Sequence, residues 1–117
     1  MKGHIKTLFM LLLATLVTGC AVEPRKKVPG NFIAGQVKFH KVCANCHGPD
    51  AMGGNKAPKL IQKKFISSNY SDQSIARIII DGSSSGAMPS MKRKVSEIEI
   101  KEIIKYLRYS QKEAELT

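Results

Sequence analysis

Cys43-Ala44-Asn45-Cys46-His47 is the most informative stretch of this chain. Its two cysteines lie three positions apart, so in a helix their thiols occupy neighbouring turns and can each add to one of the two vinyl groups of a haem. The histidine that directly follows the second cysteine then faces the iron and can ligate it through a ring nitrogen. This spacing is the attachment signal of a covalently bound c-type haem.

Other cysteine sites fit the sequence less well. A tetrahedral zinc site needs at least one more cysteine or histidine at workable spacing. Beyond the first nineteen residues, the only other histidine is His40 and the only other cysteine is Cys20, which lies far upstream. A thioredoxin-like redox pair follows a strand, whereas the residues before Cys43 indicate a helix. We therefore expect Cys43, Cys46 and His47 to bind one haem c and its iron.

The first nineteen residues have the features of an export signal. Lys2 and Lys6 provide a positive start, residues 8–17 form a short apolar run, and small residues close it before Cys20. The uncharged stretch, residues 7–22, has only 16 residues, fewer than the roughly 20 that span a bilayer. We assign residues 1–19 to a signal peptide.

Val17-Thr18-Gly19-Cys20 resembles the lipobox of bacterial lipoproteins. In that family the cysteine becomes the mature N-terminus and carries acyl chains. The resemblance implies lipid attachment at Cys20 and a location on the periplasmic side of a bacterial membrane, inner or outer. Ordinary cleavage and an uncleaved anchor are the alternatives. The lipoprotein interpretation also uses the one cysteine that the haem leaves over, since an unpaired thiol in an oxidising compartment would otherwise need an explanation.

Length and charge limit what the mature chain can be. Residues 20–117 suffice for one small domain without tryptophan or a spare disulfide, so haem binding and folding should be coupled. The formal charge of the whole chain is +10, and loss of Lys2 and Lys6 with the signal leaves +8. A basic electron carrier usually meets acidic partners. An exported haem protein does not encounter nucleic acid, which excludes that explanation of the charge.

The remaining sequence predicts helices joined by loops. Residues 20–30 should form a tether, because two prolines and a glycine oppose regular structure. Extended, this tether would hold the domain, residues 31–117, roughly 30 Å from its anchor. The β-branched residues 78–80 also permit a strand, but the overall pattern is all-α. The first expected helix has Asn31 as its N-cap and ends at about Cys43. A second runs from Ser71 to Asp81, and a short helix is expected near residues 60–65. The last begins at Ser96, which forms a capping box with Glu99, and ends at about Tyr109.

Residues 31–110 are similar to a small monohaem class I cytochrome c. Gly35-x-x-x-Phe39-x-x-x-Cys43 matches the N-terminal helix of that family, and Ile103-x-x-Tyr106 matches its C-terminal helix. The resemblance implies three to four helices around one haem, with these two helices crossing tightly at Gly35. It also implies that the Pro58 carbonyl, in Ala57-Pro58-Lys59-Leu60, accepts a hydrogen bond from the haem-ligating histidine. Such a bond fixes the ring and raises its basicity.

The sixth iron ligand must come from elsewhere in the chain. Gly86-Ala87-Met88-Pro89 resembles the loop that presents this ligand in the family, which makes Met88 the favoured residue. Met91 and Met52 compete with it, although most methionines in small proteins are packing or surface residues. His40 falls seven residues before His47; it is either a residue whose ring is satisfied by neighbours or a second ligand.

These features indicate an electron-transfer protein and not an enzyme. We expect a one-electron carrier of a bacterial respiratory chain whose two axial ligands, His47 and Met88, leave no open coordination site. Its partners should be membrane-bound respiratory complexes with acidic docking surfaces. The alternatives are a haem subunit of a larger oxidoreductase, and a haem enzyme or sensor in which a small ligand displaces Met88. A cationic rim is expected beside the haem edge, formed by Lys56, Lys59, Lys63, Lys64, Lys92, Arg93 and Lys94.

Overall fold

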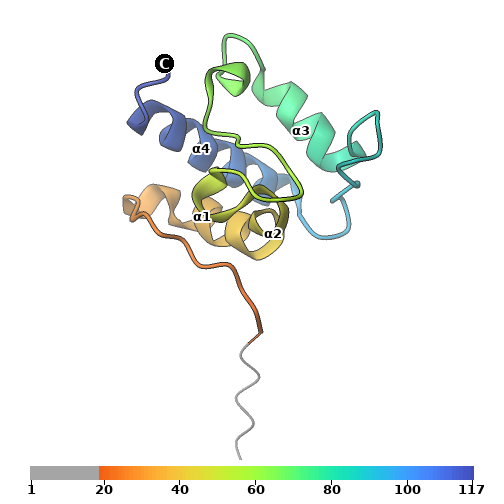
Figure 1. Cartoon of the computed structure of the whole chain (residues 1–117), viewed down its shortest axis with the longest axis horizontal. Helices are drawn as coiled ribbons and strands as arrows, with labels where there is room; N and C mark the ends of the chain where they lie inside the picture. Colours follow the sequence, from red (N-terminus) through yellow and green to blue (C-terminus); the bar gives the residue numbers. More distant parts are fainter. Residues whose placement is uncertain (1–18) are drawn as a thin grey trace, which may run out of the picture.

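The structure, a computed structural model, describes residues 19–117 (Figure 1). The predicted signal peptide thus lies outside the described residues, apart from Gly19. No strand occurs within residues 19–117, which confirms the all-α class and excludes the strand that residues 78–80 permitted. The helices are α1 (Gly30–Val42), α2 (Ala44–His47), α3 (Asp72–Asp81) and α4 (Glu97–Glu113), with 3-10 helices η1 (Pro49–Ala51) and η2 (Lys63–Phe65) in the loops.

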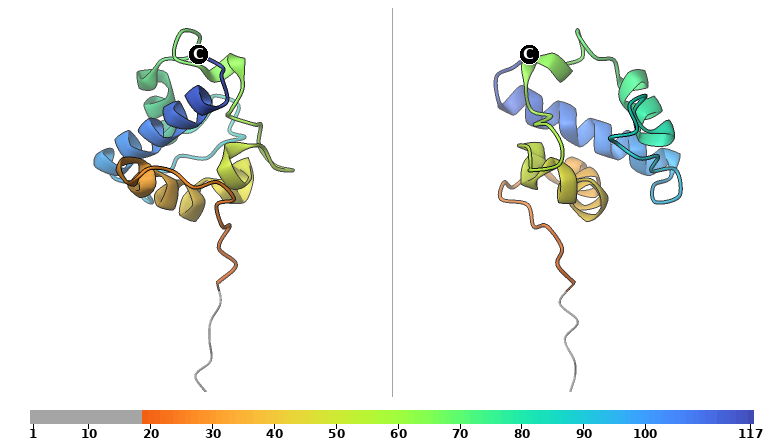
Figure 2. Two further views of the ribbon diagram at one scale, coloured as in Figure 1. Left: turned by 90° about the vertical axis from the view of Figure 1, so that its left-hand side faces the viewer. Right: turned by 45° about the vertical axis from the view of Figure 1, so that its right-hand side comes forward.

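The crossing of α1 and α4 organises the fold (Figures 1 and 2). Gly35 lies at this crossing, and a Cβ atom added to it would lie 2.6 Å from the carbonyl carbon of Glu102 and 2.8 Å from the Cβ of Tyr106. Only glycine leaves room for so close an approach of the two backbones. The expected tight crossing at Gly35 is therefore present.

Two helix starts are set by local capping, as expected. The Ser71 side chain accepts a hydrogen bond from the backbone N–H of Ser74 at the start of α3. At the start of α4, Ser96 and Glu99 form a complete capping box. Such caps satisfy backbone N–H groups that have no partner within the helix. α3 ends at Asp81 before Gly82, which has a positive φ of 83°.

Two predicted helix boundaries were wrong. α1 begins at Gly30, after Pro29, and Asn31 lies inside it and does not cap it. Proline suits this place because its fixed φ and missing N–H are compatible with a helix start. α4 continues past Tyr109 to Glu113, because Gln111 there is buried and continues the inward-facing side of the helix.

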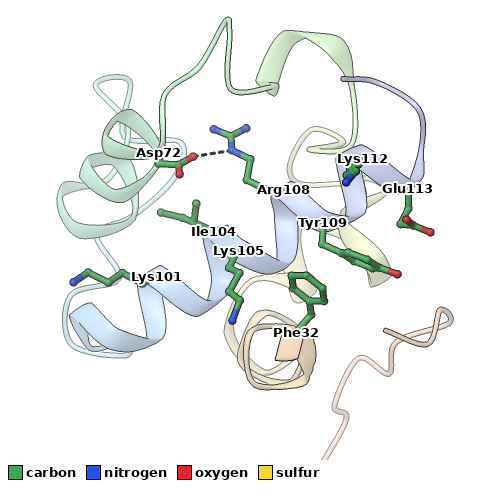
Figure 3. Close-up of a pocket in the computed structure, with 9 residues that line it drawn as sticks. All are labelled: Phe32, Asp72, Lys101, Ile104, Lys105, Arg108, Tyr109, Lys112 and Glu113. Carbon is green, nitrogen blue, oxygen red and sulfur yellow. Dashed lines mark hydrogen bonds and ion pairs between the residues drawn. The ribbon is translucent and has the colours of Figure 1, made fainter. Parts of the chain in front are cut away.

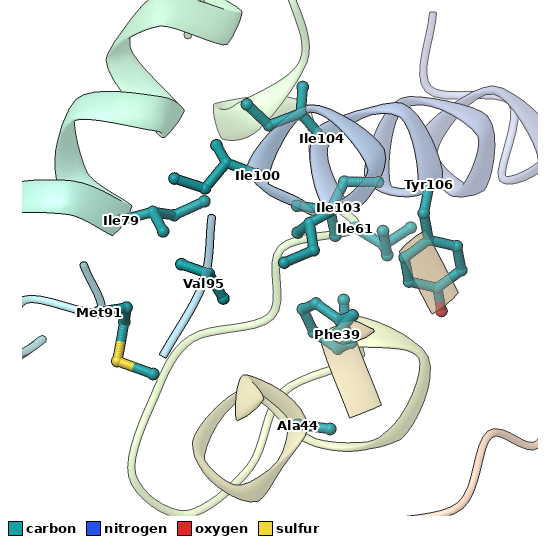
Figure 4. Packing of buried hydrophobic residues seen from close by; sticks show 12 residues of the cluster. Phe39, Ala44, Ile61, Ile79, Met91, Val95, Ile100, Ile103, Ile104 and Tyr106 are labelled. Carbon is teal, nitrogen blue, oxygen red and sulfur yellow. The ribbon is translucent and has the colours of Figure 1, made fainter. Parts of the chain in front are cut away.

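The hydrophobic core lies between α1 and α4 and extends to α3 and the loop before α4 (Figure 4). Phe39 of α1 packs on Tyr106 of α4, with ring centroids 5.6 Å apart. Met91 and Val95 continue the core toward Ile79 of α3 (Figure 4). The elements that carry the haem motif are thus attached to one continuous core.

The N-terminal segment differs from the expected free tether. Residues 20–29 have no helix or strand, as predicted, whereas Gly30, which was assigned to the tether, begins α1. Residues 22–28, here called the strap, are bound to the domain. Asp50 accepts a hydrogen bond from the backbone N–H of Arg25 at 3.0 Å, and Gln36 donates one to the carbonyl of Lys26 at 2.7 Å. Val22 and Val28 pack against the core. The strap cannot hold the domain 30 Å from an anchor while these contacts persist.

Candidate functional site

The motif residues lie on one turn of backbone at the end of α1. Cys43 separates α1 from α2, and its carbonyl accepts hydrogen bonds from the N–H groups of Cys46 at 3.1 Å and His47 at 3.0 Å. The turn therefore brings both cysteines and the histidine to one place. Cys43 and Cys46 are half-buried and carry free thiols.

The environment of the Cys43 thiol differs from that of a thioredoxin-type cysteine. Burial raises the pKa of Cys43 to about 12. Reactive cysteines of the thioredoxin type have a lowered pKa, because the thiolate is the nucleophile. This finding agrees with the sequence-based rejection of a thioredoxin-like pair.

His47 is buried, and its ring is held by the loop that follows α2. Its Nδ1 atom lies 3.0 Å from the carbonyl oxygen of Pro58. A carbonyl can only accept, so Nδ1 carries the proton and Nε2 keeps its lone pair. An imidazole with one nitrogen hydrogen-bonded and the other free is the arrangement of a metal-ligating histidine.

Several apolar side chains outside the motif are only half-buried. Half-buried side chains from α1, the loop at residues 57–62, α3 and the loop at residues 83–91 pack against the core without being covered by it. They are Val42, Leu60, Ile75, Ile80 and Met88. Two thiols, a histidine whose Nε2 makes no hydrogen bond, and incompletely buried apolar side chains are the kinds of group that a covalently bound haem requires.

The candidate distal ligands occupy different environments. Met88 is half-buried; its N–H donates to the Ser83 hydroxyl at 3.0 Å, and its carbonyl accepts from the Ser83 N–H at 2.9 Å, which fixes the backbone of this loop. Met91 is buried in the hydrophobic core, and Met52 is 43 % exposed. Met91 therefore serves packing.

His40 is a satisfied residue. Its Nδ1 bonds the carbonyl of Gln36 at 2.7 Å, and its Nε2 accepts from the N–H of Asp50 at 3.0 Å. Both ring nitrogens are thus occupied inside the protein, which leaves no lone pair for iron.

Asp50 is the centre of a buried polar cluster that the sequence did not reveal. It lies three residues after His47, is 4 % exposed, and connects the strap, His40 and the turn after the haem motif. Its φ of 55° is in the left-handed region, where a residue other than glycine is uncommon. No signal in the sequence marks Asp50, since its partners, the ring of His40 and the backbone of the strap, are distant along the chain.

The basic residues expected at the haem edge are all exposed. Four lie on the loop that contains Pro58, and three lie on the turn after Met91: Lys56, Lys59, Lys63, Lys64, Lys92, Arg93 and Lys94. Lys105 and Lys112 instead line a groove of about 700 Å³ on α4, with Phe32 and Asp72 on its walls (Figure 3).

The sequence of the chain matches a known protein family over residues 30–107, namely cytochrome c oxidase, cbb3-type, subunit III. The chain belongs to this family of c-type cytochromes. Its cofactor is a covalently bound haem c, and it is an electron-transfer protein and not an enzyme. No curated protein sequence matches the cytochrome significantly.

A solved structure confirms the cytochrome c-like fold. The crystal structure of the c-type cytochrome XoxG from Methylobacterium extorquens AM1 matches with a TM-score of 0.60 and 26 % sequence identity. The match covers 74 % of this chain and 54 % of that chain, so the cytochrome spans about half the length of the solved protein.

The class of protein bears on its location. Cytochromes of the c type are generally periplasmic or extracellular. Among residues 19–117, none of the helices combines the length and the apolar character needed to cross a membrane.

Proposed function

We propose that this cytochrome is a lipid-anchored, periplasmic one-electron carrier of a bacterial respiratory chain, with His47 and Met88 as the axial ligands. The observation that carries the proposal is the hydrogen bond between His47 Nδ1 and the Pro58 carbonyl, which leaves Nε2 free for a metal. When bound, haem c supplies one-electron chemistry between ferrous and ferric iron.

The assignment of Met88 as the distal ligand rests on where the competing residues lie and what they contact. His40 has no free ring nitrogen, and Met91 is part of the core. Met88 is half-buried on a loop whose backbone is held by Ser83. Two protein ligands would leave no position for a substrate, which suits a carrier.

The other chain residues would orient and protect the site. Pro58 fixes the ring plane of His47, while Leu60, Ile75 and Ile80 offer apolar surface that excludes water from the cofactor. Exclusion of water favours the less charged redox state and limits reorganisation when an electron moves.

The basic rim would steer the cytochrome to acidic partners. Exposed charges act over about a Debye length, roughly 8 Å at physiological salt. They should therefore raise the rate of association more than the stability of the docked complex.

The ligation is tested by the absorption spectrum of the ferrous and ferric holoprotein. We expect a low-spin iron, a sulfur-to-iron band in the ferric form, and no reaction with carbon monoxide. A high-spin iron that binds carbon monoxide at once would refute Met88 as a ligand and would favour the sensor alternative.

The docking role is tested by stopped-flow reduction with an acidic partner over a series of salt concentrations. Charge reversal of Lys92 and Lys94 to glutamate should flatten the salt dependence. The matched control reverses Lys105 and Lys112, which lie on the α4 groove. If both pairs respond alike, only the net charge of the chain matters and the rim is no docking surface.

One second function is favoured by a specific observation. The matched family is described as a subunit of a cytochrome c oxidase, so the chain would be a fixed haem subunit of a larger oxidoreductase. Purification from membranes in mild detergent separates the two proposals. A free carrier elutes alone, whereas a fixed subunit elutes with a complex in constant ratio.

A further inference from the structure

A buried side-chain amide at the end of α4 donates both of its N–H groups to the loop that holds His47. Gln111 is 1 % exposed. Its Nε2 donates to the carbonyls of Leu60 at 3.2 Å and Phe65 at 3.0 Å. Its Oε1 accepts from Nη1 of Arg108 at 2.9 Å. Both amide protons of Gln111 are thus used on one loop.

Arg108 makes three hydrogen bonds to the same region, two to loop carbonyls and one to the start of α3. Its guanidinium donates to the carbonyl of Phe65 at 2.6 Å, the carbonyl of Tyr70 at 2.5 Å and the carboxylate of Asp72 at 2.7 Å. Figure 3 shows the last of these contacts crossing from α4 to the start of α3. A planar guanidinium presents several fixed donors, which suits it to such a multiple contact.

The loop contacts continue to the ring of His47. The carbonyl of Leu60 accepts a hydrogen bond from Gln111, and the N–H of Leu60 donates one to the carbonyl of Ala51 at 2.8 Å. Leu60 is therefore fixed on both sides, two residues after Pro58. The Pro58 carbonyl, in turn, accepts the proton of His47 Nδ1. The position of that carbonyl thus depends on contacts made by α4.

We infer that Gln111, supported by Arg108, is a positioning residue for the proximal side of the haem site, setting the hydrogen bond between Pro58 and His47 and thereby the reduction potential. Both residues lie beyond residue 107, where the match to the family ends. The inference rests on the proposed ligation by His47.

The direction of the effect follows from the ligand chemistry. A well-placed acceptor raises the basicity of the imidazole, and a more basic ligand favours ferric iron over ferrous. Loosening the Pro58 loop should therefore favour ferrous iron and raise the reduction potential. Because Gln111 acts through the loop, the effect should be smaller than loss of a direct partner.

The test uses the holoprotein with Gln111→Met, which keeps the side-chain volume and removes both donors. We expect the ferrous-to-ferric ratio at a fixed ambient potential to rise about threefold, or roughly 30 mV for a one-electron couple. The NMR signal of the His47 Nδ1 proton in the ferrous state should shift with it. Phe32→Leu is the control, because Phe32 stacks on Tyr109 with ring centroids 4.2 Å apart and lines the α4 groove, to which no residue of the Pro58 loop contributes. Phe32→Leu should lower the melting temperature and leave both the reduction potential and the NMR signal of His47 unchanged.

Arg108→Lys is the second variant and decides the matter if Gln111→Met does not fold. It keeps the charge but cannot reach all of the loop carbonyls, so a smaller shift of the same sign is expected. An unchanged potential and an unchanged His47 signal in a folded variant would overturn the inference and leave Gln111 with a purely structural role. The spectrum of the unaltered protein is read first. If it shows that His47 does not ligate iron, the proposed function fails and this inference with it.

Discussion

Replacing Gly35 by alanine tests the helix crossing on which the fold depends. The new Cβ atom would lie 2.6 Å from the carbonyl carbon of Glu102, whereas ordinary contact begins at 3.4 Å. α1 and α4 must then separate by more than about 0.8 Å at the crossing, because the carbonyl oxygen of Glu102 would lie closer still and a backbone atom cannot rotate away as a side chain does. The separation would loosen Phe39 and Tyr106, which are each 1 % exposed.

The magnitude combines two opposing effects. Overpacking of this kind costs about 1–3 kcal/mol, and a clash with backbone belongs at the upper end of that range. Alanine in place of glycine stabilises a helix by about 0.5–1 kcal/mol. We expect a net loss of about 2 kcal/mol, which lowers the melting temperature of a domain of this size by roughly 8–16 °C.

The assay is thermal unfolding of the holoprotein followed by circular dichroism, with Gly30→Ala as the control. Gly30 is also in α1, but a Cβ atom there would meet nothing within 4 Å. The control should be as stable as the unaltered protein or slightly more so. If the two variants unfold at the same temperature, the close approach at Gly35 does not limit stability and our account of the crossing is wrong.

Three further predictions concern the anchor, the distal ligand and acid stability. Cys20→Ala should release the protein from membranes without loss of haem, because the anchor and the cofactor use different cysteines; a variant that sediments with membranes would contradict lipid attachment. Met88→Ala should lower the reduction potential and permit binding of carbon monoxide while the haem stays attached, and unchanged ligand-field bands would exclude Met88 as a ligand. The N–H of Ser96, together with Lys38, holds the pKa of Glu99 below its usual range. The ionised carboxylate therefore contributes stability that is fully present above its usual pKa and is lost as the pH falls through the lowered value. Glu99→Gln should flatten the fall of melting temperature below about pH 4 and leave the pH dependence near neutrality unchanged, and equal acid slopes would refute this.

Features with a local cause could be predicted from the sequence. Ser71 and Ser96 cap helices through bonds to residues three positions away, and both starts were found correctly. The requirement for glycine at position 35 and the contact of Pro58 with His47 followed from the resemblance to class I cytochromes. The structure shows both contacts.

Features that depend on distant backbone groups could not be predicted. The strap binds Asp50 across about 25 residues of sequence, and composition shows only that it lacks regular structure. For Gln111, in contrast, the sequence does contain one indication of burial. It lies four residues after Leu107 on the apolar side of α4, and a polar residue at such a position must find partners inside the protein. Its partners, Leu60 and Phe65, could not be named without the fold.

The docked strap changes how the proposed lipid-anchored form would search for its partner. In a form cleaved before Cys20, only Cys20 and Ala21 would precede Val22, the first residue of the strap that contacts the core. At about 3 Å per residue, two residues give a reach of roughly 6 Å instead of roughly 30 Å. The haem domain would then lie against the bilayer and diffuse in two dimensions, with little freedom to swing outward. Confinement to so thin a layer raises the effective concentration of any partner whose redox centre lies just above the membrane, and it denies access to one that stands farther out.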